Sequence, residues 1–393
     1  MSFNLNIPVI TIIAVLLSFF LALIIIISNI IYRRSLTKYS KDLKTNKIKY
    51  TSEFPPVSVI VYSSNDEDNI IKNIPLILEQ DYPEFEVIVV NDSSTDCSKD
   101  ILLNLELKYK RLYQTFVPLD TRNLSRKKLA ITIGIKAAKY DIVLSTAANC
   151  RPQGKDWLKS MMRNFNHGTD IVIGYSHYDY TSDSGPGKWF RIFDNIASPV
   201  QYLSCALRKR PFRGDGNNLA YRKEIFFQNK GFSKSLNLHY GDDDLFINEI
   251  ANRYNTAVEL SHESQLVSSY ENIKESNKEL KLRYGFTAKY LKTHAPLFTS
   301  FTSSVNYLFY ISIITAIVFD YSNLYTIAVC TLLLISLWIN QIMTYRKNAI
   351  ILQAPKLLFS VPLFYLIRPI DNIIYRIKGH MYKKYNFTWQ RRK

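Results

Sequence analysis

The chain has 393 residues, 47% of them hydrophobic, and a formal net charge of +17. This length provides one large buried core and leaves residues over for other segments. The positive charge clusters beside apolar segments, which favours anionic lipid headgroups as partners and argues against a nucleic acid. The four cysteines have no paired spacing, so the sequence predicts neither a disulfide framework nor a zinc site.

Three apolar segments, residues 7–31, 301–319 and 324–343, are long enough to cross a membrane. The first lacks the basic start and the small-residue cleavage site of a signal peptide, so it is expected to be a retained anchor. Basic residues crowd positions 33–49, which predicts an external N-terminus and a cytoplasmic middle region. Residues 350–367 are interrupted by prolines and precede a basic tail, so they are expected to lie in the membrane interface.

These segments divide the chain into five parts. They are a transmembrane anchor (1–32), a basic juxtamembrane connector (33–52), a cytoplasmic α/β domain (53–295), two transmembrane helices (296–345), and an interfacial segment with a basic cytoplasmic tail (346–393).

Short apolar runs alternate with helical patterns in the middle region. Strands are expected at 57–62, 85–90, 141–144 and 170–174, and helices at 70–78, 98–110, 127–139, 157–165 and 245–254. The first three runs end in polar clusters. Because parallel strands form ligand crevices at their carboxyl ends, we expect these clusters to meet at one crevice.

Two of the candidate sites suit parts of a nucleotide. Asp92 follows the second strand, where a carboxylate can accept hydrogen bonds from a base N–H or from ribose hydroxyls; a turn or helix cap is the alternative. Lys127 and Lys128 open a helix, and a helix N-terminus with lysines suits a diphosphate. Solvated surface lysines are the alternative interpretation of that pair.

Two further candidates lie downstream. The stretch 214–222 contains Gly214 and Gly216, which permit close backbone approach, although a plain turn explains the same residues. Asp242, Asp243 and Asp244 are consecutive and repel one another, which predicts at least one raised pKa and a proton acceptor. An acidic helix start is the alternative.

Several short motifs occur in a specific order. They are Val57–Val61 with Asn65–Glu67, Gln80–Pro83, Val89–Asp92 with Ser94–Asp96, Lys127–Ala130, Cys150–Pro152, Asn218–Lys223 and Gly241–Leu245. With these motifs, the region 55–291 resembles the family 2 inverting glycosyltransferases of the membrane-anchored bacterial type. The resemblance implies a GT-A (Rossmann-like) nucleotide-sugar-binding domain, in the bacterial inner membrane, that uses a UDP- or GDP-linked donor.

The resemblance also implies roles for single residues. Asp92 resembles the family's nucleotide-contacting aspartate, with Asn65 and Glu67 near the base, and Lys127 falls near the lysine below the diphosphate, beside Lys128. Asp243 resembles the base that deprotonates the acceptor hydroxyl, and its neighbours Asp242 and Asp244 complete the acidic motif. Gly216, Asn218, Arg283 and Tyr284 are assigned to the acceptor and the diphosphate.

Two departures from the family pattern stand out. Ala147, Ala148 and Asn149 replace the metal-binding Asp-x-Asp, and hard divalent cations prefer anionic oxygens, so the sequence argues against a bound metal. Lys127, Lys128, Arg151 or Arg283 would then neutralise the diphosphate. The second departure is Leu280–Tyr284, which keeps the Arg and an aromatic of a Gln-x-x-Arg-Trp element but lacks the Gln.

The remaining alternatives concern partners and activity. Residues 185–212 mix basic and aromatic side chains, which suits either the lipid headgroup zone or packing of an amphipathic segment on the domain. The expected partners are membrane lipids, a lipid-linked or glycan acceptor, and other glycan-assembly proteins. The rivals to an active enzyme are a catalytically silent scaffold or regulatory subunit and a lipid-binding protein without nucleotide affinity.

Overall fold

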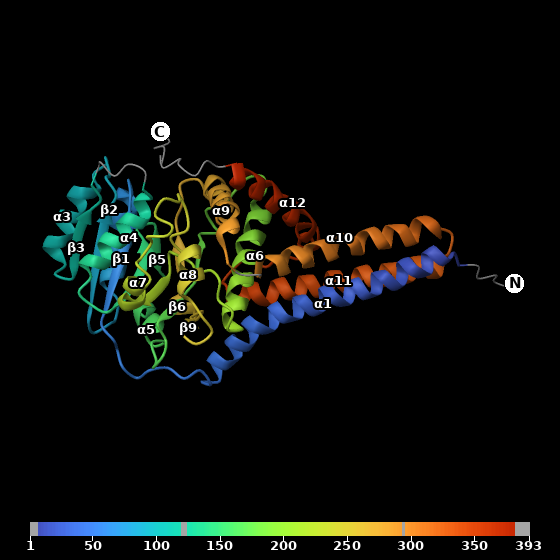
Figure 1. Cartoon of the computed structure of the whole chain (residues 1–393), viewed down its shortest axis with the longest axis horizontal. Helices are drawn as coiled ribbons and strands as arrows, with labels where there is room; N and C mark the ends of the chain where they lie inside the picture. Colours follow the sequence, from blue (N-terminus) through green and yellow to red (C-terminus); the bar gives the residue numbers. More distant parts are fainter. Residues whose placement is uncertain (1–6, 119–123, 293–294, 382–393) are drawn as a thin grey trace.

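The computed structural model describes residues 7–118, 124–292 and 295–381 (Figure 1). An α/β domain forms one end of the molecule, and a bundle of long helices projects from it. Three helices, α6, α9 and α12, lie where the domain meets the bundle. The predicted fold class, an α/β domain with helices long and apolar enough to span a membrane, is therefore confirmed.

The main sheet of the described residues has seven strands in the order β3-β2-β1-β4-β8-β6-β9. Their bounds are β1 Val57–Ser63, β2 Phe85–Asn91, β3 Leu112–Phe116, β4 Ile142–Ala147, β6 Ile171–Ile173, β8 Leu219–Arg222 and β9 Thr256–Val258. Strands β1, β2 and β4 run parallel, as the sequence predicts, and β3, which the sequence did not predict, runs parallel to β2. Strand β8 runs antiparallel to both β4 and β6. A second sheet joins β5 (Cys150–Pro152), β10 (Leu266–Ser268) and β7 (Ser176–Tyr178).

Helices cover both faces of the main sheet. Val59 and Val61 of β1 point to one buried cluster and Ile60 to the other, which is the two-residue alternation of a strand. The domain helices are α2 Glu67–Leu78, α3 Ser98–Lys108, α4 Arg126–Ala137, α5 Trp157–Met162, α6 Lys188–Leu207, α7 Lys223–Gln228, α8 Asp244–Ile250 and α9 Ile273–Thr287, with short turns η1 His262–Ser264 and η2 Ala288–Tyr290.

Helix α6 decides between the two interpretations of residues 185–212. Its Phe193, Ile196 and Leu203 are buried in the main hydrophobic core, which the packing alternative predicts. Trp189, near its start, has 52% of its surface exposed. The segment therefore packs on the domain while keeping one large aromatic side chain at the surface.

Three helices of the described residues are long and apolar enough to cross a membrane: α1 (Val9–Lys44), α10 (Ala295–Phe319) and α11 (Leu324–Ile351). They lie side by side as the projecting bundle (Figure 1), and many of their large apolar side chains are exposed. Helix α10 ends and α11 begins where the sequence predicts, but α11 continues beyond residue 343.

The predicted connector is not separate from the first span. Helix α1 runs without a break through residue 32 to Lys44. Leu36 and Tyr39 are buried in the core of the α/β domain, and the Tyr39 hydroxyl donates to Glu259 Oε1 at 3.1 Å. The positive charge of residues 33–49 predicted a connector at the membrane surface, and it gave no sign that Leu36 and Tyr39 are buried in the domain.

Helix α12 (Ser360–Met381) lies against α9 and α6 at the junction of the two parts (Figure 1). Exposed apolar side chains follow the helical repeat along one side: Leu363, Ile367, Ile370, Ile374 and Ile377. The expected interfacial segment 350–367 thus includes the end of α11 and the start of an amphipathic helix. The last part of the basic tail, residues 382–393, lies outside the described residues.

Candidate functional site

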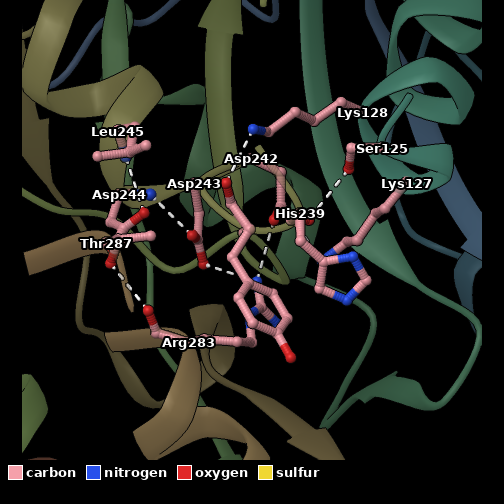
Figure 2. A network of polar contacts seen from close by, with 12 residues as sticks. Ser125, Lys127, Lys128, His239, Asp242, Asp243, Asp244, Leu245, Arg283 and Thr287 are labelled. Carbon is pink, nitrogen blue, oxygen red and sulfur yellow. Dashed lines mark hydrogen bonds and ion pairs between the residues drawn. The ribbon is translucent and has the colours of Figure 1, made fainter. Parts of the chain in front are cut away.

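The candidate site is built where β1 and β2 end and α4 begins. The loop 239–244 and helix α9 complete it, and Figure 2 shows the polar contacts among the start of α4, this loop and α9. Most side chains named from the sequence lie here, although several have a different task from the predicted one.

Asp92 follows β2 and is buried, with 6% of its surface exposed. Its Oδ1 accepts from Arg126 Nε at 2.7 Å and forms an ion pair with Arg126 Nη2 at 2.5 Å. Its Oδ2 accepts from the Tyr62 hydroxyl at 2.8 Å. Burial and the neighbouring Asp92 carboxylate raise the pKa of Tyr62, so Tyr62 stays a proton donor. Arg126 and Tyr62 were not among the predicted site residues.

Asn65 and Glu67 fix the loop that follows Asp92. Asn65 Oδ1 accepts from the backbone N–H of Thr95 at 2.8 Å, and Glu67 Oε2 accepts from that of Cys97 at 2.9 Å. Asn65 itself has a φ of 52°, in the left-handed region that Asn tolerates better than most residues. Both residues therefore border the Asp92 side of the site by shaping its loop.

The two adjacent lysines of α4 point in different directions. Lys127 Nζ pairs with Asp242 Oδ2 at 2.7 Å and lies 6.0 Å from the centre of the Tyr62 ring. Lys128 points into the protein and is fully buried. Its Nζ donates to the carbonyl oxygens of Ser235, Leu238 and Tyr240 at 2.6, 3.2 and 2.8 Å.

The assignment of Lys128 to a diphosphate is therefore wrong. An ammonium has three donors, and all three are used by backbone carbonyls. Burial lowers the pKa of Lys128 to about 8. Lys128 instead holds the segment that leads into the three aspartates.

The three carboxylates turn to different partners (Figure 2). Asp242 Oδ1 accepts from Arg283 Nη2 at 3.1 Å, and burial, which would raise the pKa of Asp242, is outweighed by Lys127 and Arg283, which hold it well below its usual range. Asp243 caps α8 by accepting from the backbone N–H of Asp244 at 2.7 Å. Its Oδ2 lies 3.6 Å from Arg283 Nη2.

Asp244 connects two helices through its side-chain contacts. It is 1% exposed, and its Oδ2 accepts from the Thr287 hydroxyl and pairs with Arg213 Nη2 at 3.4 Å. Burial and the adjacent Asp243 raise the pKa of Asp244, which confirms the prediction of at least one raised pKa in the triplet. The carboxyl with the raised pKa is, however, that of Asp244, which joins α8 to α9 through Thr287.

Gly216 lies directly against the acids. A Cβ added to it would be 3.0 Å from Asp243 Cβ, 3.3 Å from Asp243 Oδ2 and 3.5 Å from Asp242 Oδ2. The glycine therefore keeps open the space beside Asp243, as its assignment to the acceptor side requires.

Asn218 does not border that space. It is fully buried, its Nδ2 donates to the carbonyl oxygens of Tyr175 and Ser264 at 3.0 and 2.8 Å, and its Oδ1 accepts from Trp157 Nε1 at 3.2 Å. Its assignment to the acceptor is wrong, because every donor and one acceptor site of the amide serve the core.

Helix α9 supplies the remaining predicted pair. Arg283 reaches both Asp242 and Asp243, while Tyr284 lies beneath the Arg213 guanidinium, 3.8 Å from the ring centre. Tyr284 thus takes part in a cation–π contact that supports the Arg213–Asp244 pair. Arg283 is the member of the pair that faces the acids.

Sequence reasoning missed Asp215, the residue between the two glycines. Its Oδ2 accepts from the backbone N–H and the hydroxyl of Ser176, both at 2.7 Å, and its Oδ1 accepts from the backbone N–H of Asn217 at 3.1 Å. Burial raises the pKa of Asp215. The sequence could have indicated Asp215, because it is an acidic residue between Gly214 and Gly216. Its hydrogen bonds to Ser176 connect this loop to β7.

The turn at residues 147–149, where the resemblance places the Asp-x-Asp motif, offers no anionic oxygen. Asn149 Nδ2 donates to the Ser269 carbonyl at 2.9 Å, and the backbone N–H of Ala148 donates to the Tyr62 carbonyl at 2.9 Å. Within the described ranges, no cluster of three or more His, Cys, Asp or Glu side chains is suited to a metal ion. This neutral donor set does not fit a divalent cation. Arg151, one proposed substitute, pairs instead with Asp179 at 3.6 Å.

Residues 58–235 match the family model described as "Glycosyl transferase family 2". Glycosyltransferase AglE of Haloferax volcanii is 26% identical over 149 residues, which cover 37% of this chain and 47% of that protein. Poly-beta-1,6-N-acetyl-D-glucosamine synthase of Staphylococcus aureus is 22% identical over 202 residues, 51% of this chain and 45% of that protein. The chain thus spans less than half the length of these relatives.

Among solved structures, the mannosyltransferase PcManGT from Pyrobaculum calidifontis, in complex with GDP-Man and Mn²⁺, aligns with a TM-score of 0.53 and 17% identity. The alignment covers 91% of this chain and 99% of that chain, so the likeness of fold includes the helices outside the α/β domain. Residues 58–235 of the α/β domain are thus similar to glycosyl transferase family 2, and the fold of the domain is the mixed α/β fold of GT-A glycosyltransferases.

Proposed function

We propose that this chain is a membrane-bound glycosyltransferase that moves a sugar from a UDP- or GDP-linked donor to a lipid-linked acceptor, with inversion at the anomeric carbon. The match of residues 58–235 to the family 2 model supports glycosyl transfer from a nucleotide sugar. The membrane, the acceptor class and the stereochemistry are the further parts of the proposal.

One observation carries the proposal. Asp92, at the expected nucleotide end, and Asp243, at the expected acceptor end, are connected through a short series of contacts. Tyr62 binds Asp92 and faces Lys127, Lys127 pairs with Asp242, and Arg283 contacts both Asp242 and Asp243. One sugar nucleotide with its diphosphate near Lys127 suits this arrangement.

The residues suggest how the reaction proceeds. Asp243 accepts the proton of the acceptor hydroxyl, and the resulting oxygen attacks the anomeric carbon from the side opposite the diphosphate. The bond between that carbon and the diphosphate oxygen breaks, and its electron pair leaves with the nucleoside diphosphate. Arg126, Lys127 and Arg283 supply positive charge where the negative charge of the leaving group grows.

The helices support a membrane location. α1, α10 and α11 have the length and composition of membrane spans and expose apolar side chains, and α12 has an exposed apolar side beside them. Exposed apolar surface of this extent is characteristic of contact with lipid or with a partner. An acceptor held in the membrane would reach the site from the side of α9 and α12.

Nucleotide binding is the first test. Purified protein is titrated with UDP and with GDP, with and without Mn²⁺, by isothermal titration calorimetry. We expect binding that Mn²⁺ does not strengthen and that Asp92→Ala weakens at least ten-fold. Binding that requires Mn²⁺ contradicts the role given to the cationic side chains.

Transfer is the second test, with extracted membrane lipids as acceptors. Asp243→Asn is expected to remove sugar transfer while leaving nucleotide affinity within two-fold of the parent protein. Transfer at the parental rate by this variant would mean that another group is the base.

A silent scaffold or regulatory subunit is a second candidate function, favoured by two observations. Asp92 and Asp242 are already ion-paired with Arg126 and Lys127, and Ala147 replaces an expected metal ligand. If neither UDP nor GDP binds in the titration, the scaffold is the better description.

A further inference from the structure

A cavity of about 110 Å³ lies where the helix bundle meets the α/β domain, between α1, α6, α10, α11 and α12. A single water requires roughly 10–15 Å³ by the same kind of measure, so the cavity holds a group much larger than one water. It is lined by residues outside the candidate site, including Asn306, Gln341 and Asn348.

These three amides share an unusual property. Among the described residues, Asn306 Oδ1, Gln341 Oε1 and Asn348 Oδ1 are buried and have no hydrogen-bond partner. The side chains are 6%, 1% and 2% exposed, and Gln341 and Asn348 are two helical turns apart on the same face of α11. An unpaired buried acceptor is costly, so three in one cavity indicate a partner from outside the chain.

The charge around the cavity argues against an anionic partner. Arg368 lines the cavity, but its Nε already donates to Asp194 Oδ1 at 2.7 Å and its Nη2 to the Ser198 hydroxyl at 2.9 Å. Asp194 also pairs with Lys281 Nζ at 3.0 Å. An ionised lipid phosphodiester has only acceptor oxygens, and three amide oxygens would repel it.

Hydroxyl groups fit the cavity better. A hydroxyl donates one hydrogen bond and accepts others, so several of them can satisfy amide oxygens that have no donor. The rest of the wall includes the aromatic rings of Phe193 and Tyr345, whose centres are 5.7 Å apart. A compact group with several hydroxyls and an apolar body suits both kinds of lining.

We propose that this cavity binds the neutral, hydroxyl-rich headgroup of a membrane lipid, whose acyl chains lie against the exposed apolar faces of the bundle. Asn306, Gln341 and Asn348 accept hydrogen bonds from its hydroxyls. The proposal concerns binding alone, so it holds or fails separately from sugar transfer at Asp243.

The test uses the full-length chain in nanodiscs of phosphatidylcholine that contain one tenth monoglucosyl diacylglycerol. Native mass spectrometry measures how much of each lipid stays bound as the nanodisc is removed. We expect the glucosyl lipid to be enriched about ten-fold over its share in the nanodisc. The double variant Gln341→Leu with Asn348→Leu is expected to abolish the enrichment and leave bound phosphatidylcholine unchanged.

Two further variants keep the test decisive. Ser336→Ala on the same helix, where the hydroxyl is exposed and donates to the Leu333 carbonyl, should keep the full enrichment. Asn306→Leu on α10 should lower the enrichment as the double variant does. This variant tests the proposal if the double variant does not fold. Leucine in place of an unpaired amide is expected to keep or raise Tm in lipid-free detergent.

Three results would overturn the proposal. The first is retention of the glucosyl lipid in no greater proportion than its share of the nanodisc. The second is equal enrichment in the leucine variants and the parent protein. The third is loss of the enrichment on adding millimolar free glucose, which would identify a site for a soluble sugar.

Discussion

The space beside Asp243 can be tested with one methyl group. The φ of Gly216 is not positive, so alanine can adopt its backbone conformation. The only change in Gly216→Ala is therefore the added Cβ. The new atom would be 3.0 Å from Asp243 Cβ, whereas ordinary contact begins at 3.4 Å, so something must move by about 0.4 Å. The atoms that move belong either to Asp243, the prospective base, or to the loop that contains Gly216.

The size of the effect follows from that displacement. A shift of about 1 Å at a reacting group costs roughly a hundred-fold in rate, so a shift of about 0.4 Å alone is expected to cost about six-fold. The methyl also occupies space beside Asp243 Oδ2, where the acceptor hydroxyl must lie. Sugar transfer should therefore fall at least ten-fold while nucleotide affinity and Tm change little, since Asp92 is untouched.

Gly154→Ala is the matched control. An added Cβ there meets nothing within 4 Å, and this residue likewise has no positive φ. Transfer onto extracted lipids, nucleotide titration and thermal unfolding are measured for both variants and the parent. Transfer within two-fold of the parent by Gly216→Ala, at equal Tm, would show that the reaction does not use the space beside Asp243.

Three more predictions follow from individual contacts. Ala147→Asp combined with Asn149→Asp should make UDP or GDP binding respond to Mn²⁺ in calorimetry; an unchanged response would argue against the position assigned to the motif. Burial lowers the pKa of Lys128 from 10.5 to about 8, so the unfolded chain binds the proton more tightly than the folded protein does. The free energy of unfolding, and with it Tm, should therefore rise between pH 8 and pH 10.5, by about 3 kcal/mol. In Lys128→Met this rise should be absent. Asn218→Ala removes three hydrogen bonds from the core and should lower stability by about 3 kcal/mol in thermal unfolding, without a selective loss of acceptor affinity in the folded protein.

The sequence predicted the parts of the domain that depend on local pattern. Strands β1, β2 and β4 are continuous apolar runs, because parallel strands are buried on both faces, and their polar ends indicated the site. Strands β5, β7, β9 and β10 have three residues each, too few to show any periodicity. They exist because of partners far along the chain, which one sequence does not reveal.

The same limit applied to the site. Lys127 and Lys128 are adjacent and chemically alike, and only the packing of α4 on the sheet decides which ammonium faces Asp242 and which faces the core. Composition likewise gave no means of ranking Asp242, Asp243 and Asp244. The three aspartates differ in role because they contact Arg283, Arg213 and Thr287, which come from distant parts of the chain.

The continuity of α1 has a mechanical consequence. At 36 residues it is a rod of about 54 Å, of which a bilayer would enclose about 30 Å, and its C-terminal end is held in the domain by Leu36 and Tyr39. With its N-terminal part in a bilayer, such a rod would set the height and tilt of the domain above the membrane. Shortened versions for solution work should begin before residue 34, because a cut at residue 45 discards a piece of the folded domain.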